Sequence, residues 1–331
     1  MEFAFELALC AHLEATADAV VARQLGAAVA APGSRVVDVC LVEPGPNFGE
    51  RTRITDATVP PLAVESAVGV GEWVRPRDAF ESYGEYTTAV VDDAVAAGFF
   101  ERRHRGGSEQ IRQAVRYPEG WFDRLVAVEN KPDLGTPGDL ERQLQTDASL
   151  GLFDEVVLAT ESYVTRAHLN RIPEAVGVWR FRPDSGGSGA GGDGADTGDL
   201  EVVREPTPLD PTALGVEATA RRSLRTDVAF VSGAEKARKR RRIAERSYGK
   251  GWRTYDLPPC AAAAPTADGR PRCAHYGRVV DPASDCGADC PGFDAADPPA
   301  VDLDALRATR SPWVRDPGGV ARRQSGLDRF L

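Results

Sequence analysis

Residues 125–160 read LVAVENKPDLGTPGDLERQLQTDASLGLFDEVVLAT, and this stretch decides the fold class. The apolar run 125–128 predicts a buried strand that ends in the tripeptide ENK at 129–131. A Thr-Pro pair then predicts the start of a helix, and Gly151 predicts its end. The run 155–160 predicts a second buried strand. A strand, a crossover helix and a strand form a βαβ unit with a parallel pair, so we expect an α/β fold.

The segments before this unit predict a helix and a strand. Residues 2–29 carry apolar side chains at helical spacing without an internal breaker before Gly26, and we interpret them as one amphipathic helix. Residues 35–42 read RVVDVCLV, a short β-branched run that predicts a buried strand with Asp38 in its middle. A carboxylate inside such a strand is costly to bury and is therefore a candidate functional group, although backbone groups could also satisfy it.

Residues 60–118 form a different kind of segment. They predict Ala-rich and Val-rich helices that close at Gly98, followed by a hairpin that turns at Gly106-Gly107. Helices followed by an Arg-bearing hairpin resemble a winged helix, a frequent DNA-binding module. The alternative is an insertion that packs beside the core. The candidate nucleic-acid contacts in the hairpin are Arg102, Arg103 and Arg105.

The composition limits the class of protein. The chain has 331 residues, a formal charge of -10, and only four lysines among its 40 basic residues. An acidic chain that uses Arg in place of Lys resembles salt-adapted archaeal proteins, so the net charge does not exclude a nucleic-acid partner. No stretch approaches the roughly 18 apolar residues of a membrane span, and no signal peptide is indicated. We expect a cytoplasmic protein without a membrane partner.

The tripeptide at the end of the first strand carries the candidate chemistry. Alternate residues on a strand share a face, so we expect Glu129 and Lys131 to project together. A carboxylate and an ammonium there can hold a hard divalent cation and position a water. Lys131 is the only lysine in the first 235 residues, and a compact ammonium suits this role better than a guanidinium. The alternative is a solvated ion pair at the end of a strand.

The order of these elements resembles the restriction-endonuclease-like nucleases of the PD-(D/E)xK superfamily, which include RecB-like members. The residues that carry the resemblance are Asp38 in its strand, the VAVENK strand, the ERQLQTD helix and the EVVLAT strand. It covers roughly residues 1–45 and 121–182. The resemblance implies an αβββαβ core with a mixed central sheet, and it implies hydrolysis of phosphodiester bonds.

The resemblance also implies a set of site residues. Asp38 and Glu129 would ligate Mg²⁺ or Mn²⁺, with the Asn130 carbonyl as a further ligand. Asp123 is a rival for the first acidic position, but it lies on or just before the same strand as Glu129 and too far along it to share one metal. Lys131 would orient or activate the attacking water and stabilise the charged phosphate.

Two helices would supply the remaining groups. The resemblance matches Gln143 to the glutamine that many RecB-like members present from the helix after the second acid. It matches either Glu6 or Glu14 to the helical glutamate that some members add, and the spacing does not choose between them.

Two features depart from the family pattern: no proline precedes Asp38, and about 90 residues separate Asp38 from Glu129. We therefore expect an insertion there. The predicted organisation is a nuclease-like core in 1–50 and 119–210 with a disordered hairpin loop at 184–199, a winged-helix-like insertion in 51–118, a basic helical segment in 211–256 and a cysteine-containing tail in 257–331.

The basic segment around residues 236–246 predicts a helix with cations around its whole circumference. Such a helix is not expected in a core, and it suits contact with a phosphate backbone. The alternative is a solvated helix that offsets an acidic surface. The candidate contacts are Lys236, Arg238, Lys239, Arg240, Arg241 and Arg242.

The tail contains four of the six cysteines, in a segment with almost no apolar pattern. A structural metal would explain how it folds, and we expect tetrahedral Zn²⁺ with four thiolates, or with His275 in place of one. An iron–sulfur cluster and free thiols are the alternatives. Cys10 and Cys40 lie in apolar patterns and are expected in the core. The four candidate ligands are Cys260, Cys273, Cys286 and Cys290.

Together these observations predict a Mg²⁺-dependent nuclease that acts on DNA, in repair or defence. Two alternatives remain at this point. The first is a nucleic-acid-binding or regulatory protein that keeps the nuclease fold without catalysis, and the second is an enzyme that acts on RNA, because a fold does not fix a substrate.

Overall fold

The structure is a computed structural model of the chain. It describes residues 2–31, 33–51, 59–66, 68–69, 72–80, 84–114, 119–136, 138–183, 198–221 and 225–315.

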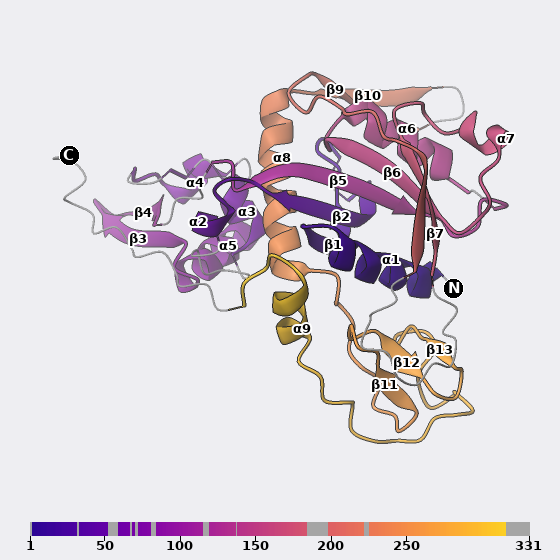
Figure 1. Cartoon of the computed structure of the whole chain (residues 1–331). Helices are drawn as coiled ribbons and strands as arrows, with labels where there is room; N and C mark the ends of the chain where they lie inside the picture. Colours follow the sequence, from indigo (N-terminus) through magenta and orange to yellow (C-terminus); the bar gives the residue numbers. More distant parts are fainter. Residues whose placement is uncertain are drawn as a thin grey trace.

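The centre of the molecule is one mixed six-stranded sheet (Figure 1). Its three middle strands are parallel to one another, and the flanking strands pair antiparallel. The α/β prediction with a mixed central sheet is therefore confirmed. In spatial order the strands are β1 (Val20–Gly26), β2 (Val36–Pro44), β5 (Phe122–Asn130), β6 (Glu155–Thr160), β7 (Gly177–Arg182) and β8 (Asp199–Arg204).

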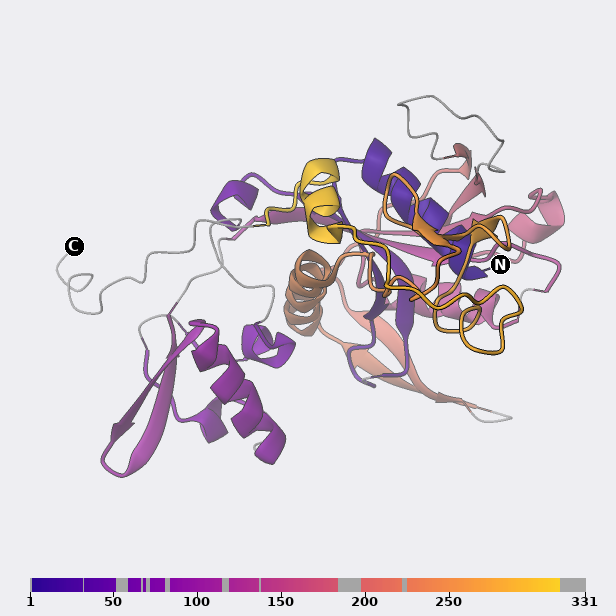
Figure 2. The same ribbon diagram turned by 90° about the horizontal axis from the view of Figure 1, so that it is seen from below.

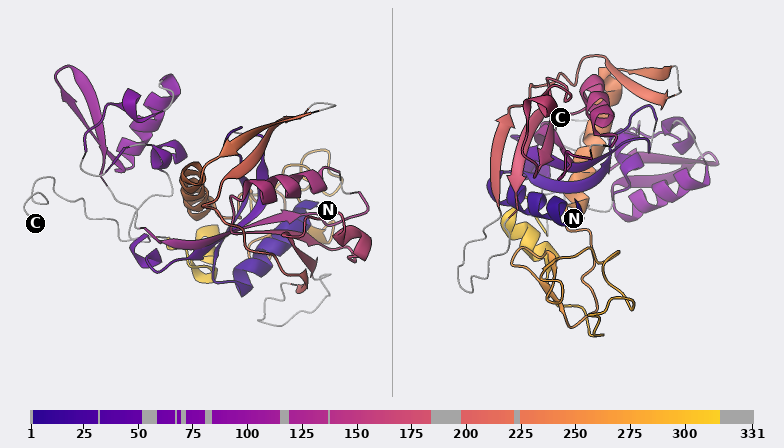
Figure 3. Two further views of the ribbon diagram at one scale, coloured as in Figure 1. Left: turned by 90° about the horizontal axis from the view of Figure 1, so that it is seen from above. Right: turned by 90° about the vertical axis from the view of Figure 1, so that its right-hand side faces the viewer.

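Helices cover both faces of the sheet (Figure 3). Helix α1 (Glu2–Thr16) packs on one face, where Leu9 joins Val39 and Val128 in one apolar cluster. Helices α6 (Leu140–Leu150) and α8 (Gly233–Lys250) pack on the other face, in a second cluster. Cys10 and Cys40 are fully buried in these two clusters, as predicted.

The prediction of one helix over residues 2–29 is wrong in its second half. Helix α1 ends at Thr16, and residues 20–26 form strand β1, which pairs antiparallel with β2. The apolar side chains of this stretch occur at spacings that suit a helix and a buried strand alike. Pairing with a neighbouring strand decides between them, and that information lies outside the segment.

The βαβ unit is confirmed, with β5 and β6 parallel and α6 between them in the chain. The predicted start of the helix is early, because α6 begins at Leu140. Thr136 instead donates its hydroxyl to the carboxylate of Asp133, and Pro137 lies outside the described residues. The end is as predicted, because Gly151 adopts a left-handed φ of 57° directly after α6.

The segment between β2 and β5 contains short helices and one hairpin. Its turn at Gly106-Gly107 has positive φ at both residues, which is the conformation that favours glycine. Residues of this segment form an apolar cluster of their own, and it projects to one side of the sheet (Figure 2). Its elements are α2 (Phe48–Arg51), α3 (Pro61–Glu65), α4 (Pro76–Ala79), α5 (Glu85–Ala96), β3 (Phe100–Arg105) and β4 (Ser108–Gln113).

The prediction that the basic helix lies outside the core is wrong. Helix α8 buries Ile243, Ala244 and Tyr248 against the sheet. Its cations do not prevent this, because the Lys236 amine donates to the carbonyls of Leu150 and Gly151 at the end of α6, at 3.2 and 3.1 Å. A buried ammonium that is hydrogen-bonded in this way is tolerated in a core. The predicted boundary near residue 210 therefore separates elements that pack together.

The remaining elements surround this core. A hairpin of β9 (Gly215–Arg221) and β10 (Thr226–Val231) contacts α6, and α7 (Arg166–Leu169) follows β6. The tail contains β11 (Ala263–Pro265), β12 (Pro271–Cys273), β13 (Arg278–Val279) and α9 (Leu303–Arg310).

Hairpin strands β7 and β8 flank the predicted disordered loop as expected, but most of that loop, residues 184–197, lies outside the described residues, as do residues 316–331 of the tail. In the described part of the chain, none of the helices combines the length and the apolar character that a membrane crossing requires.

Candidate active site

Three carboxylates lie together at one end of the sheet. Asp38 comes from β2, Glu129 from the end of β5 and Glu6 from α1. The antiparallel register pairs Val39 with Val128, so Asp38 and Glu129 occupy the next positions along the two strands. The sheet therefore brings together two acids that are 91 positions apart in the chain, as the sequence predicted.

Asp38 lies where the regular alternation of β2 is interrupted. Val37 packs in the cluster below α8, whereas Val39 packs in the cluster below α1, although the two are only two residues apart. The Asp38 carboxylate accepts a hydrogen bond from the backbone N–H of Asn130 at 2.9 Å and a longer one from the Gln24 amide at 3.4 Å. Gln24 itself has a left-handed φ of 55°, which is uncommon for a residue other than glycine.

Glu6 lies on the α1 side of this group. Its carboxylate accepts hydrogen bonds from the Asn130 and Gln24 side-chain amides, at 2.6 and 2.9 Å, and lies 3.2 Å from the Arg23 guanidinium. Because Asn130 donates its Nδ2 to Glu6, its Oδ1 is the remaining polar atom, and this buried oxygen has no hydrogen-bond partner among the described residues. A buried amide oxygen without a partner is unusual and costly.

Burial makes the ionised form of each of the three carboxyl groups unfavourable. Burial raises the pKa of Glu6 to about 7, and the charge of Asp38 adds to the increase. Burial and the Asp38 carboxylate likewise raise the pKa of Glu129 to about 7. Burial also raises the pKa of Asp38, although the Asn130 N–H opposes this effect. A cation placed among the three groups would reverse these increases.

These shifts predict how stability depends on pH. The two glutamates have a pKa near 7 in the folded chain against 4.5 when unperturbed, so the folded state binds protons more tightly. Their ionisation therefore destabilises the fold as the pH rises from 5 to 8. We expect the free energy of unfolding, measured in urea with EDTA, to fall over this range by the order of 3 kcal/mol for each carboxyl. The variant Glu6→Gln/Glu129→Gln should lose this dependence; an equal slope in the variant would contradict the assignment.

Arg35 is a site residue that the sequence did not suggest. Its guanidinium lies 2.6 Å from the Glu129 carboxylate and also 2.6 Å from Asp147, which α6 presents. All three side chains are almost fully buried. Arg35 directly precedes β2, and Asp147 lies in a helix that the sequence predicted. What the sequence did not predict is the ion pair between these two residues. Glu129 thus already has a cationic partner.

Lys131 directly follows strand β5, and its backbone N–H donates to the Ala159 carbonyl of β6 at 2.9 Å. The Lys131 amine lies 3.9 Å from the Glu2 carboxylate at the start of α1, and the side chain is 28% exposed. Lys131 is therefore at the rim of the acidic group, next to α1.

Gln143 and Glu14 have different relations to the site. Gln143 is half-buried and lies one helical turn before Asp147, so it shares the face of α6 that contacts Arg35. Glu14 instead binds the Arg253 guanidinium and the Trp252 indole, at 2.5 and 3.0 Å. These contacts hold Glu14 away from the acidic group, so the prediction of Glu14 as an alternative metal ligand is corrected. The glutamate of α1 that lies in the acidic group is Glu6.

The oxygen atoms of this group are of the chemical type that binds a hard divalent cation. It offers carboxylate oxygens and one amide oxygen without a partner, which are the ligands that Mg²⁺ prefers. The arrangement is not a ready ligand cage. Glu6 lies on the α1 side of the sheet and Glu129 on the α6 side, and across the described ranges no group of three or more His, Cys, Asp or Glu side chains is placed so that it could hold a metal ion.

Four of the nine predicted nucleic-acid contacts have partners within the chain that the structure shows directly. Arg102 pairs with Asp92 and Glu109, and Arg103 lies over the Trp73 ring at 4.1 Å. In α8, Lys236 is buried, and Arg240 binds the Leu152 carbonyl and Asp154. Lys236 is too deeply buried to contact a phosphate backbone, so that prediction is corrected, whereas the other three remain predictions.

The other predicted contacts differ in exposure. Arg105 is exposed at the hairpin turn, Arg238 and Arg241 are exposed on α8, and Lys239 and Arg242 are half-buried. These five keep their status as predictions.

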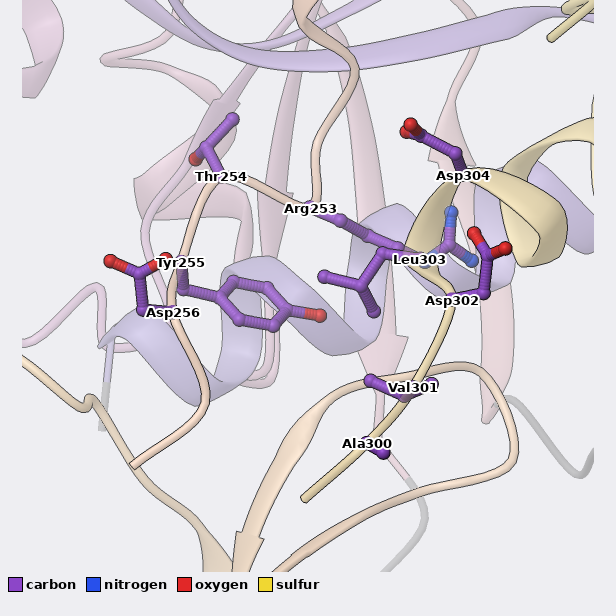
Figure 4. Close-up of a pocket in the computed structure, with 9 residues that line it drawn as sticks. All are labelled: Arg253, Thr254, Tyr255, Asp256, Ala300, Val301, Asp302, Leu303 and Asp304. Atoms are coloured by element: carbon purple, nitrogen blue, oxygen red, sulfur yellow. The ribbon is translucent and has the colours of Figure 1, made fainter. Parts of the chain in front are cut away.

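A large open hollow lies elsewhere, between segments 253–256 and 300–304 (Figure 4). It measures about 880 Å³ and is lined by Asp256, Asp302 and Asp304 together with Arg253, which binds Glu14. None of the acidic site residues lines it. Three carboxylates beside one occupied guanidinium do not suit a phosphate group.

Comparison with known proteins identifies a family. The chain belongs to a family of unknown function (DUF5787), whose model matches residues 20–295. The matched range includes Asp38, Glu129 and Lys131, and it also includes the four cysteines of the tail, whereas Glu6 lies outside it. No curated protein and no solved structure matches the chain.

Proposed function

We propose that this protein is a metal-dependent nuclease that hydrolyses phosphodiester bonds of DNA. The observation that carries the proposal is the group of Glu6, Asp38 and Glu129, which buries negative charge at a cost that a bound cation would remove. The partnerless Oδ1 of Asn130 lies beside the same group and adds a neutral oxygen ligand. Buried carboxylates with raised pKa values are typical of functional sites.

The chain order of the core supports the same proposal. Helix α1, strands β1, β2 and β5, helix α6 and strand β6 follow one another in the order αβββαβ, with the insertion between β2 and β5. This is the order that the resemblance to restriction-endonuclease-like nucleases implies. The two acids of the resemblance lie next to each other at the ends of the second and third strands of that core.

In the proposed site, Asp38 and Glu129 would hold Mg²⁺, with Glu6 and the Asn130 amide beside them. The bound ion would supply a polarised water and would withdraw charge from the phosphate. Lys131, at the rim, would orient the water and stabilise charge on the phosphate oxygens. Arg35 would keep the Glu129 carboxylate in position through its contact with Asp147, and Gln143 would face the substrate from α6.

The test is cleavage of supercoiled plasmid DNA by the full chain in high KCl, with Mg²⁺, Mn²⁺ or EDTA. We expect nicking with either metal and none with EDTA. Asp38→Asn should lower the rate by about 100-fold or more, because it removes the charge on which metal binding depends. Asp123→Asn is the matched control, because that aspartate is exposed on the far end of β5, and its rate should not change.

One observation favours a second candidate, a nucleic-acid-binding protein without catalysis. The Arg35 guanidinium already neutralises Glu129 and Asp147, as a metal would in an active nuclease. The same experiment decides between the two. Binding of DNA without nicking under Mg²⁺ or Mn²⁺ would contradict the nuclease and favour the binding protein.

A further inference from the structure

The four cysteines of the tail gather around one small enclosed cavity. Cys260 precedes β11, Cys273 ends β12, and Cys286 and Cys290 follow β13 in the chain. All four line the cavity, which has a volume of about 10 Å³. That is room for about one small atom. In Figure 1 the strands β11, β12 and β13 of this part of the tail lie below α1.

The segment that contains these cysteines, residues 257–298, has almost no apolar core. Its described buried apolar side chains are two of the cysteines, two prolines and Val280, and among its described residues only Val279 packs against the cluster below α1. Its three strands have three, three and two residues. A unit of about 40 residues usually needs a disulfide or a metal to fold, because it buries too little apolar surface. The cysteines are free thiols in the structure, so a disulfide does not supply the link.

The surroundings of the sulfur atoms suit thiolates. The backbone N–H of Asp294 points to the Cys260 sulfur at 3.5 Å, and the Tyr276 hydroxyl lies 3.4 Å from the Cys290 sulfur. Such donors are the usual outer partners of metal-bound cysteines.

We propose that Cys260, Cys273, Cys286 and Cys290 bind one zinc ion as four thiolates and that this ion holds residues 257–298 in their folded form. Each thiol releases a proton when it binds, and four soft thiolates in a closed site are typical of structural zinc. His275 is not a ligand, because its exposed ring packs over Gly292 and does not line the cavity.

Zinc binding requires rotation of cysteine side chains. Within the residues that the structure describes, no three such ligands already stand in a metal-binding arrangement. The Cys260 thiol is directed to the Gly292 carbonyl at 3.9 Å, and Cys290 is directed to Tyr276. Both are rotations about the χ1 bond of an otherwise unbranched side chain, which cost little compared with the binding free energy of structural zinc.

The test is elemental analysis of the full chain, purified without added metal or chelator, together with its absorbance spectrum. We expect one zinc per chain and no visible absorbance. Cys286→Ser and Cys290→Ser should each lower the zinc content to less than half. Cys10→Ala is the matched control, because it removes a buried thiol outside the cluster and should leave one zinc bound.

A second measurement does not depend on the variants. Replacement of zinc by Co²⁺ should give the visible absorption of tetrahedral thiolate coordination, and a strong chelator should remove both the metal and the resistance of residues 257–298 to protease. Iron with visible absorbance, zinc retained in both serine variants, or a metal-free chain with either four free thiols or disulfides in the tail would each overturn the proposal. None of these outcomes depends on nuclease activity.

Discussion

Replacing Lys131 by alanine is expected to abolish Mg²⁺-dependent cleavage of DNA, with a loss of about 100-fold or more in the single-turnover rate. The amine lies at the rim of the acidic group and is only loosely paired, 3.9 Å from the Glu2 carboxylate. It can therefore reach a water or phosphate oxygen without breaking a buried contact. Binding of DNA should stay within about threefold of the parent, because one surface cation contributes little to a multi-phosphate contact.

Two further variants separate the chemistry from the charge. Lys131→Arg keeps the positive charge but not the compact ammonium, and we expect it to bind DNA normally and cleave slowly. Arg225→Ala removes one positive charge from a side chain that is 66% exposed just before β10, and it should cleave at the parent rate. Cleavage by Lys131→Ala at an undiminished rate would remove Lys131 from the mechanism. Equal losses of binding and cleavage would make it a contact residue only.

The second large effect concerns stability. Arg35→Met should lower the free energy of unfolding by about 3–5 kcal/mol at pH 8 in EDTA, because it leaves Glu129 and Asp147 buried without a cation. The loss should shrink at pH 5, where both carboxyls take up protons more readily, since burial raises the pKa of each. Urea unfolding followed by circular dichroism measures both values.

A triple variant should restore the stability lost in Arg35→Met, and an exposed arginine of α6 provides the control. Removing the two negative charges in the triple variant Arg35→Met/Glu129→Gln/Asp147→Asn should restore a large part of the lost stability. Arg142→Met changes an arginine of α6 that is 51% exposed and pairs with Asp139 three residues away, so its effect should stay within about 0.5 kcal/mol. If Arg35→Met cost no more than Arg142→Met, the buried pairing would have no part in the fold.

The sequence predicted those helices and strands whose residue pattern fits only one type of secondary structure. Buried strands such as 155–160 and the glycine that ends α6 depend on local chemistry, and both appear where expected. Residues 20–26 were assigned to a helix because nothing within the segment separates an apolar strand from an apolar helix. Their pairing with β2 involves residues up to 22 positions later, so a local pattern could not include it.

The same limit applies to α8. Its many cations predicted a surface helix, because a sequence shows the charge but not its partner. In the structure the Arg51 guanidinium is fully buried, binds Glu245 of α8 at 2.7 Å and lies over the Tyr248 ring. Contacts between residues nearly 200 positions apart offset charges that look unsuitable for a core. Charge counts along a helix therefore do not determine whether it is buried.

For the candidate site, the sequence predicted two acids and the structure adds their surroundings. The neighbouring positions of Asp38 and Glu129 follow from strand pairing. The roles of Gln24, Arg35 and Asp147 could not be predicted, because each depends on a contact across elements. The choice of Glu6 over Glu14 also needed coordinates, since the two acids are eight residues apart on one helix and only their partners, Asn130 and Arg253, distinguish them.

The position of α8 has a consequence for synthesis on the ribosome. The sheet is complete in the chain by Arg204, but its second face is then covered only in part, by α6, because α8 ends at Lys250. A nascent chain that has released the strands therefore displays the rest of that apolar surface until some 50 further residues have left the exit tunnel. A chain shortened at the compositional boundary near residue 210 would display that surface permanently and would tend to aggregate.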